Sequence, residues 1–351
     1  MKNLNVSPRS RRLQADARND LIAALSERVV GQPEAMANIV PYIQMHQAGL
    51  APAGRPIGVF LLLGPTGTGK TKTVEALADV LHGAEKHLLK VDCGEFQMEH
   101  EVAKLIGAPP GYLGHRETQP LLTQQKVNGV AGERSNLSIV LFDEIEKAAP
   151  SMTRLLLGVL DKAILRLGDN TTVNFEKTLI FLTSNLGAQS MKKEISPDFG
   201  FEALVPRERA NLTDKLQQIG LAAVRRKFSP EFVNRIDAVV TYQPLCATAL
   251  TAILEQQLVD LQRHIINRLG PRAFGLDINR ATRQFLLRKG TSQEYGAREL
   301  KRTLHRNLTQ PLAALVASGQ IPPGCLVRVE VGDDKEHLVL RRVIDPSPRA
   351  A

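Results

Sequence analysis

The stretch VFLLLGPTGTGKT, from Val59 to Thr71, decides the fold of this chain. Its first five residues are apolar, which suits one short buried strand. The next eight, Gly64 to Thr71, fit the pattern G-x-x-x-x-G-K-[ST] at every position. Apolar residues then recur at helical spacing, at Val74, Leu77, Ala78 and Leu81. A strand, a glycine-rich loop and a helix in this order place backbone N–H groups and a helix N-terminus around phosphate oxygens.

The glycine-rich loop therefore predicts a binding site for ATP and Mg²⁺. Lys70 would reach the β- and γ-phosphates, and the hydroxyl group of Thr71 would bind Mg²⁺. The predicted nucleotide-binding residues of the loop are Gly64, Pro65, Thr66, Gly67, Thr68, Gly69, Lys70 and Thr71.

A second apolar run, Ile139 to Phe142, ends in two carboxylates. Asp143 would lie beside the metal, usually through water, and Glu144 would orient and deprotonate the attacking water. A strand that ends in Asp-Glu can be an ordinary turn, but its position downstream of a phosphate-binding loop favours the catalytic interpretation. Glu144 predicts hydrolysis, because without a base the chain would be a nucleotide-binding switch.

Three further polar residues are candidates for sensing the phosphates. Asn185 follows the run Thr178–Thr183, where its amide could hydrogen-bond both water and the γ-phosphate, although an isolated Asn at a strand end more commonly caps a turn. Arg235, in FSPEFVNRID, and Arg298, in YGAREL, could stabilise the charge of phosphoryl transfer. Without this context, each arginine would be interpreted as a surface residue.

Short apolar runs alternate with helix-period segments up to residue 243, which is typical of a parallel α/β sheet. The predicted strands are Val59–Leu63, His87–Asp92, Ile139–Phe142, Thr178–Thr183 and Ala238–Tyr242. After Pro244 the pattern changes to a long amphipathic helix and further helices. Two alternating strands then follow, Leu326–Val331 and Leu338–Val343.

These changes in pattern predict four parts of the chain. Residues 1–19 are polar and basic, which is typical of a flexible N-terminal segment, and residues 346–351 form a tail. Residues 20–242 would form a large α/β ATPase domain that holds the phosphate-binding loop and both carboxylates. Residues 243–345 would form a smaller α+β domain.

Composition narrows the partners and the location. The net charge of +9 suggests an acidic partner, but Trp is absent and Tyr and Phe are few, so a base-stacking surface is not predicted and nucleic acid is not the expected partner. No apolar run approaches the ~18 residues of a membrane span, so no membrane partner is expected. Cys93, Cys246 and Cys325 are widely spaced and form no CxxC pair, which predicts a cytoplasmic protein.

Read together, the motifs resemble the second ATPase module of Clp-type unfoldases, the ClpA/ClpB group of AAA+ proteins. The matching segments are VVGQPEAM (Val29–Met36), RPIGVFLLLGPTGTGKT, LIGAPPGYLG, VLFDEIEKA, FLTSNLGA, FSPEFVNRID and EYGARELKR. They extend over most of the chain. The resemblance implies an AAA+ P-loop NTPase fold: a parallel five-stranded sheet flanked by helices, plus a smaller α+β C-terminal domain.

The resemblance also implies roles for single residues. Val29 and Val30 match the segment that lines the adenine pocket, and Asn185 matches sensor 1. Arg298 matches sensor 2, which the small domain places on the γ-phosphate of its own subunit. Arg235 matches the arginine finger, which acts on ATP held by the neighbouring subunit. A finger supplied to a neighbour implies a ring, and the ring of this family is a homo-hexamer.

Tyr112, within GYLG, matches the pore-loop aromatic that grips a threaded polypeptide; the alternative is a loop aromatic packed on a neighbour. Two segments depart from the family, residues 115–137, with HRETQPLL and a longer QQKVNGVAGERSN, and residues 162–172, with KAILRLGDNTT. These departures do not affect the residues of ATP chemistry. They leave undecided how the module handles its substrate. The sequence shows no counterpart of the first ATPase module, of the N-terminal domain, or of the coiled-coil insertion that couples disaggregases to DnaK-type chaperones. A partnership with DnaK through such an insertion is therefore not expected.

Phe199, Gly200 and Phe201 lie where protease-coupled relatives carry a short docking tripeptide. Such a tripeptide on an exposed loop could bind a pocket of a partner protease. The alternative is that the two phenylalanines anchor the loop to the core.

The favoured hypothesis is an ATP- and Mg²⁺-dependent hexameric motor that unfolds or remodels protein substrates through a central pore. The first alternative is an ATP-switched assembly factor that acts on a dedicated partner complex without threading; the altered segments favour it, and the intact GYLG opposes it. The second is a nucleic-acid motor, supported only by net charge. Stimulation of the ATPase by unfolded protein, by nothing or by DNA would separate the three.

Overall fold

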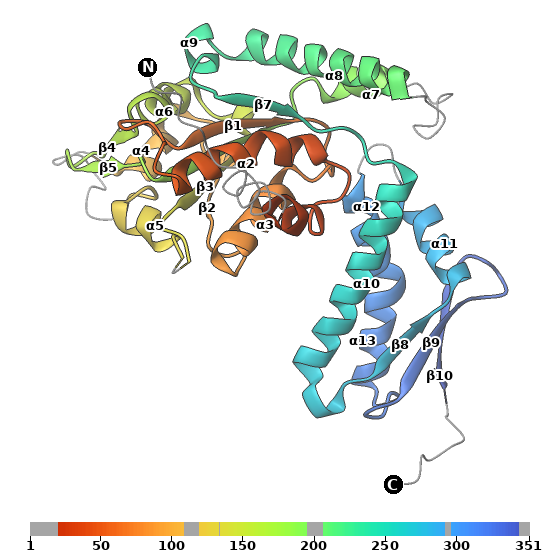
Figure 1. Cartoon of the computed structure of the whole chain (residues 1–351). Helices are drawn as coiled ribbons and strands as arrows, with labels where there is room; N and C mark the ends of the chain where they lie inside the picture. The colour runs from red at the N-terminus through yellow and green to blue at the C-terminus, as the bar shows by residue number, and fades with distance from the viewer. Residues whose placement is uncertain (1–19, 109–118, 133, 195–205, 292–295, 344–351) are drawn as a thin grey trace, which may run out of the picture. The chain divides into compact units, whose positions relative to one another are not determined.

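The computed structural model describes residues 20–108, 119–132, 134–194, 206–291 and 296–343 (Figure 1). Tyr112, Phe199–Phe201, the segment 1–19 and the tail 346–351 lie outside these ranges, so what the sequence predicts for them stays a prediction. The chain divides into two compact units and passes from the first to the second between Gln243 and Pro244. The short stretch Thr66–Thr68 groups with the second unit.

A five-stranded sheet forms the centre of the first unit, with the strand order β2-β3-β6-β1-β7. Its strands are β1 (Gly58–Leu63), β2 (Leu89–Asp92), β3 (Ser138–Asp143), β6 (Thr178–Ser184) and β7 (Ala238–Thr241). Every neighbouring pair is parallel, which confirms the parallel sheet predicted from the apolar runs. The carboxyl ends of the strands therefore meet at one edge, where Leu63 is opposite Ser184 and Asp92 is opposite Asp143.

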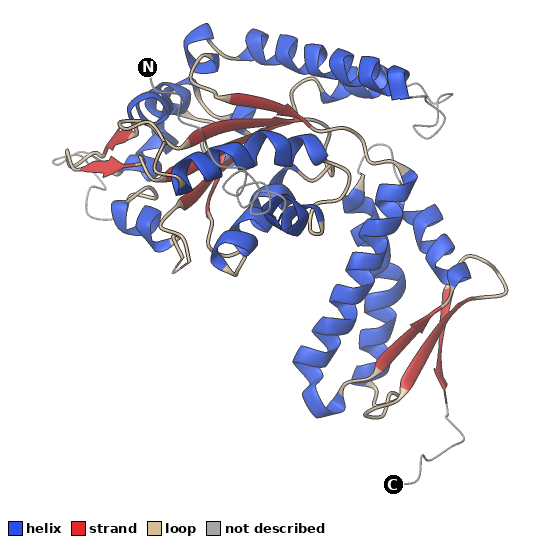
Figure 2. Ribbon diagram, in the orientation of Figure 1, coloured by secondary structure: helices blue, strands red, loops and turns tan. Residues whose placement is uncertain are grey.

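Helices flank this sheet on both faces, as predicted (Figure 2). One face packs against α2 (Pro33–Gln47), α3 (Lys70–His82) and the helical residues 20–26. The other packs against α6 (Pro150–Lys162), α8 (Pro206–Lys227) and α9 (Pro230–Val233). The shorter elements are α4 (Val102–Ile106), α5 (Gln124–Gly129), α7 (Ala188–Glu194), and the 3₁₀ turns η1 (Cys93–Glu95), η2 (Glu99–Glu101) and η3 (Ile145–Lys147).

A small antiparallel hairpin follows α6 directly and includes most of the segment 162–172. It pairs β4 (Ile164–Arg166) with β5 (Thr172–Asn174). Leu165 and Val173, opposite each other in the middle of the two strands, are buried in the core. Each of these strands has three residues and only one that points into the core. A single buried residue gives no repeating pattern from which a strand could be predicted.

The second unit is an α+β domain, as predicted. Its helices are α10 (Ala247–Leu269), α11 (Arg280–Gly290), α12 (Ala297–Leu304) and α13 (Gln310–Ala317), with the turn η4 (Gly270–Arg272) and the π-helical η5 (His305–Thr309). A three-stranded sheet joins β8 (Gly275–Ile278), β9 (Leu326–Val331) and β10 (Leu338–Val343). The strands β9 and β10 have the predicted bounds and pair antiparallel. The strand β8, which is four residues long and parallel to β9, was not predicted from the sequence.

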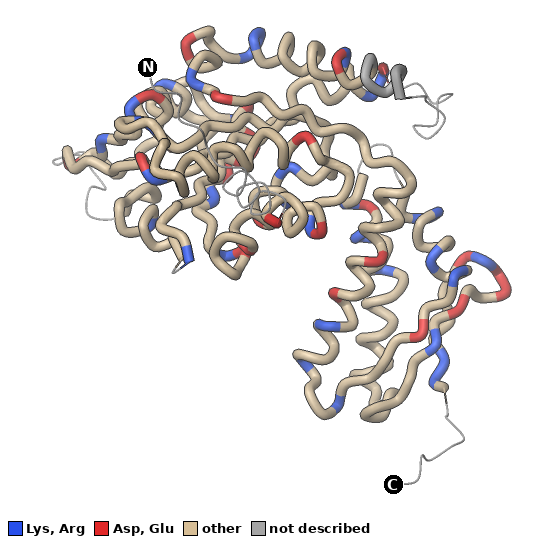
Figure 3. The backbone as a smooth tube through the Cα atoms, viewed as in Figure 1, with Lys and Arg blue, Asp and Glu red and all other residues tan. Residues whose placement is uncertain are grey.

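Charged residues are spread over both units. Lys and Arg positions are interspersed with Asp and Glu positions along the described backbone (Figure 3). In the ranges that the structure describes, no helix has both the length and the apolar character that a membrane crossing requires.

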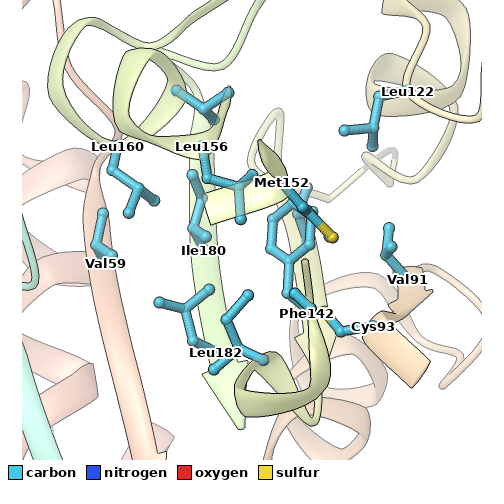
Figure 4. Packing of buried hydrophobic residues seen from close by; sticks show 14 of the residues in the cluster. Val59, Val91, Cys93, Leu122, Phe142, Met152, Leu156, Leu160, Ile180 and Leu182 are labelled. Carbon is cyan, nitrogen blue, oxygen red and sulfur yellow. The ribbon is translucent and has the colours of Figure 1, made fainter. Parts of the chain in front are cut away.

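The core of the first unit explains why the strand sequences are continuously apolar. Along β1, Val59, Leu61 and Leu63 belong to one buried cluster, and Phe60 and Leu62 belong to the cluster on the opposite face. A parallel sheet covered on both faces has no polar side, so its strands show no alternation. Figure 4 shows one of these clusters, where side chains of α6, Met152, Leu156 and Leu160, face the strand residues Phe142, Ile180 and Leu182.

Leu156→Ala should lower the free energy of unfolding of the first unit by about 2–5 kcal/mol, because Leu156 is fully buried against the sheet and its truncation leaves a cavity. Leu50→Ala is the matched control: the same atoms are removed from a side chain that is 74% exposed, and the change should be within about 0.5 kcal/mol. Urea unfolding followed by circular dichroism measures both. Equal effects of the two substitutions would contradict the packing of α6 on the sheet.

Candidate active site

The phosphate-binding loop joins the carboxyl end of β1 to the N-terminus of α3. Gly64 has φ 145°, and a Cβ atom there would lie 2.6 Å from the carbonyl oxygen of Tyr242, so only glycine fits. Gly69 precedes α3 with φ 106°, a conformation that glycine adopts far more readily than other residues. Pro65 and the stretch Thr66–Thr68 complete the loop. The backbone conformation of the loop therefore requires glycine at these two positions, whether or not a ligand is bound.

Lys70 is the first residue of α3 and is buried, with 8% of its surface exposed. Its Nζ donates hydrogen bonds to the carbonyl oxygens of Gly64 at 2.6 Å and of Pro65 at 2.9 Å. A third bond goes to Oδ1 of Asn185, at 2.9 Å, just beyond β6. The ammonium group has three donors, and these contacts give all three an acceptor. Lys70 therefore ties the loop after β1 to the neighbouring strand.

Asn185 connects this lysine to the second carboxylate. Because its Oδ1 accepts from Lys70, its Nδ2 is left to donate, and it does so to Oε1 of Glu144 at 3.3 Å. The backbone N–H of Asn185 also donates to Oε1 of Glu146 at 3.0 Å. The structure thus brings three predicted site residues, Lys70, Asn185 and Glu144, into one hydrogen-bonded chain.

Asp143 lies at the end of β3 with three partners. Thr71 Oγ1 is 3.4 Å from Oδ1, Thr183 donates to the same oxygen, and Nζ of Lys90 is 2.7 Å from Oδ2. Burial by itself raises the pKa of Asp143, but the hydrogen bonds from Lys90 and Thr183 outweigh it, so that the pKa lies below its usual value. Asp143 is therefore an anion at neutral pH.

Glu144 has an unusual backbone. Its φ of 56° and ψ of 49° are left-handed, which for a residue with a Cβ atom costs about 1–2 kcal/mol. The N–H of Glu144 donates to Oγ1 of Thr183 at 3.0 Å, and its carboxylate forms an ion pair with Lys147. The strand turns sharply at this residue, and the contacts of its N–H and carboxylate hold it there.

The residues present fit a Mg²⁺ ion and phosphates. The hydroxyl of Thr71 and the carboxylate of Asp143 are oxygen donors, the type that Mg²⁺ prefers, and they lie side by side. Nearby carboxylates make this sheet edge electronegative. Burial first, then Asp92, Asp143, Glu146 and Glu144, raise the pKa of the Cys93 thiol. A cation is attracted to such a site, and the positive end of the helix dipole at the N-terminus of α3 suits an anion.

Three contributors were not predicted from the sequence: Thr183, Lys90 and Lys147. Thr183 bridges Asp143 and the backbone of Glu144. The one sequence signal for this role is that Thr183 is a polar residue near the end of a buried strand. Lys90 reaches Asp143 because β2 and β3 are paired in register, which the sequence does not reveal. Lys147 is three residues after Glu144, and this spacing could have suggested the ion pair.

Within the first unit, the described residues show no hydrogen bond or ion pair that joins Val29, Val30 or Arg235 to this cluster. Val29 is buried in the core beside α2, Val30 is half-buried, and the following Gln32 is fixed to the backbone of Gln243 by two hydrogen bonds. Arg235 forms an ion pair with Asp161 instead. Arg298 is an exposed residue in the first turn of α12, in the second unit.

The chain matches two protein families in succession. Residues 55–239 match the family described as AAA domain (Cdc48 subfamily), and residues 245–329 match the C-terminal, D2-small domain of ClpB protein. The chain belongs to the AAA+ family. It is a Clp-type ATPase module with its small C-terminal domain, which confirms the resemblance and identifies an ATP-hydrolysing enzyme of a family that binds nucleotide with Mg²⁺.

Relatives and solved structures agree with this assignment. The chaperone protein ClpB of Meiothermus ruber is 38% identical over 308 residues, which are 88% of this chain and 33% of the relative. ClpB of Corynebacterium diphtheriae is 36% identical over 335 residues, 95% of this chain and 35% of the relative. The chain thus spans about a third of the length of the curated relatives it matches. A structure of the S. cerevisiae Hsp104:casein complex has a TM-score of 0.78 and 26% identity, covering 96% of this chain and 55% of that one.

Thr183→Val should lower the ATPase rate of the module by about 10- to 100-fold, because valine has the shape of threonine but cannot orient Asp143. The loss should be accompanied by a higher Mg²⁺ concentration for half-maximal rate. Thr178→Val is the matched control, since Thr178 is equally buried at the opposite end of β6 and its hydroxyl bonds only a backbone carbonyl. If both variants lose the same activity, or neither does, Thr183 does not organise the site.

Proposed function

We propose that this AAA+ module is an ATP-driven motor that unfolds or remodels protein substrates as a homo-hexameric ring. The substrate would thread through a central pore and be gripped by Tyr112. The observation that carries the proposal is the hydrogen-bonded chain from Lys70 through Asn185 to Glu144, since it couples a phosphate-binding lysine to a base. Protein as the substrate is supported by relatives named as chaperone ClpB and by solved complexes of Hsp104 with casein.

The proposed reaction transfers the γ-phosphoryl group of ATP to water. The carboxylate of Glu144 would take a proton from the attacking water as the water oxygen bonds to phosphorus, and the bond from phosphorus to the β–γ bridging oxygen would break to leave ADP. Asn185 donates to one oxygen of this carboxylate, and Lys147 pairs with the other. A base held at both oxygens keeps one orientation toward the water.

Charge on the phosphates would be balanced by residues of the same sheet edge. Lys70 would place its ammonium group against the β- and γ-phosphates. Thr71 and Asp143 would hold Mg²⁺, which when bound neutralises phosphate charge and orients the γ-phosphate. Val29 and Val30 would line the adenine pocket.

Two arginines would complete the site from other parts of the assembly. Arg235 would act as the finger on ATP of the neighbouring subunit, and Arg298 as sensor 2 on ATP of its own subunit. The ion pair of Arg235 in the described ranges is with Asp161 and not with a residue of the ATP site, which supports a role toward a neighbour. Docking of a protease through Phe199–Phe201 and a cytoplasmic location stay predictions from the sequence.

Glu144→Gln should retain ATP and abolish its turnover, at least about a hundredfold, because the amide keeps the shape of the side chain and removes the base. In the presence of ATP, this variant should also hold fluorescent casein in a complex that survives gel filtration, whereas the wild-type module should hydrolyse ATP and release the casein. Steady-state ATPase assays and gel filtration measure the two effects. Glu99→Gln, an exposed carboxylate in a surface ion pair, is the control and should behave as wild type.

The two readouts separate the parts of the proposal. Near wild-type hydrolysis by Glu144→Gln would show that the base is wrongly assigned. Loss of hydrolysis without retention of casein, and without stimulation of the wild-type ATPase by casein, would contradict the motor on protein chains. Stimulation by DNA in place of casein would contradict it in favour of a nucleic-acid motor.

A further inference from the structure

Arg235 is held by a carboxylate that belongs to a different element. Its Nε lies 3.2 Å from Oδ1 of Asp161, in the last turn of α6. The two side chains are 35% and 38% exposed. The ion pair therefore lies at the surface, where both side chains are partly covered by the protein and partly exposed to solvent.

The backbone on the Arg235 side is anchored in the core. Arg235 follows α9, whose Phe232 is 1% exposed and stacks on Phe228 with ring centroids 5.0 Å apart. Ser229 caps this short helix by accepting from the N–H of Phe232, and the N–H of Arg235 donates to the carbonyl oxygen of Phe232. The Cα atom of Arg235 is thus fixed, and only its long side chain is free to turn.

The backbone on the Asp161 side is anchored in the same way. Leu160 and Ala163, on either side of Asp161, are fully buried. The N–H of Ala163 closes the end of α6 on the carbonyl oxygen of Val159, at 3.0 Å. The carboxylate of Asp161 is therefore presented to Arg235 from a rigid helix end.

The geometry of the pair leaves most of the guanidinium group available. The Nε atom is buried and close to Asp161, but its N–H is not aligned for a hydrogen bond, so the contact is one of charge. Within the described residues, the terminal Nη1 and Nη2 atoms make no hydrogen bond. Arginine binds phosphate best through two parallel N–H donors. A carboxylate near Nε restrains the group and leaves the terminal donors for another ligand.

We propose that Asp161 is a positioning residue that orients the Arg235 guanidinium group toward the γ-phosphate of ATP in the neighbouring subunit. This inference rests on the proposed role of Arg235 as the finger. An exposed ion pair of this kind contributes little to stability, because solvent screens it and two side chains lose freedom. The orientation of a finger can nevertheless carry a large part of its effect on rate, since a small misplacement of a catalytic group slows the reaction strongly.

The test compares Asp161→Asn, Asp161→Glu and Arg235→Ala by steady-state kinetics. Arg235→Ala should lower kcat by about 10³-fold. Asp161→Asn should lower kcat by about 10-fold with KM for ATP unchanged, and Asp161→Glu should restore most of the rate, because it restores the charge. The control, Asp277→Asn, removes a carboxylate of similar exposure from the ion pair with Arg328 in the second unit, and should leave kcat unchanged.

Two further measurements distinguish positioning from a structural role. Adding Asp161→Asn to the Arg235→Ala variant should slow the reaction no further. The melting temperature of the single variant Asp161→Asn should match that of Asp277→Asn. Mixed with Lys70→Ala subunits, which cannot hydrolyse ATP but carry an intact Asp161–Arg235 pair, Asp161→Asn subunits should regain activity above that of either variant alone.

Each contrary result has a separate meaning. A wild-type kcat for Asp161→Asn beside a slow Arg235→Ala overturns the positioning role alone and leaves the finger in place. Additive losses in the double variant, or a melting temperature well below that of Asp277→Asn, show that Asp161 acts through the fold and overturn it as well. A wild-type kcat for Arg235→Ala overturns the finger, and the role of Asp161 falls with it.

Discussion

The buried ammonium group of Lys70 organises the site on which the rest of the account depends. A buried charge without partners is costly by several kcal/mol, so its three donors need acceptors from the protein or from a ligand. Two come from the loop itself, and the third is the amide oxygen of Asn185. This choice leaves the amide N–H₂ for Glu144. The lysine that meets the phosphates and the base that meets the water are thereby placed relative to each other.

The parallel sheet is what allows such a chain of contacts. Because all strand ends meet at one edge, residues from β1, β2, β3 and β6 converge there although they are far apart in sequence. The edge collects acidic residues, whose charge is felt at Cys93, and lysines that pair with them. Thr183 bridges the two carboxylate positions, and Glu144 takes a strained backbone conformation beside it. The site is polar and tightly interconnected, and the core beneath it is apolar on both faces of the sheet.

Much of this could be predicted from the sequence, for physical reasons. A strand buried on both faces is a continuous apolar run, as in VFLLL, and phosphate binding needs glycine and lysine at fixed spacing. The strands β4, β5 and β8 have three or four residues each and depend on distant partners, so no local pattern reveals them. The contact of Lys90 with Asp143 depends on strand register, and that of Asp161 with Arg235 depends on the packing of α6 against α9. A single sequence does not contain such information.

Single-turnover hydrolysis of ATP by Asn185→Asp tests the central claim most directly. The substitution is nearly isosteric and keeps an oxygen for Lys70, but it replaces the N–H donor to Glu144 with a second carboxylate oxygen. We expect that ATP still binds and that the rate of the chemical step falls by about 10²-fold or more, since a positioned donor is lost and like charges face each other. Hydrolysis at the wild-type rate would contradict the central claim, because Glu144 would then be oriented without Asn185.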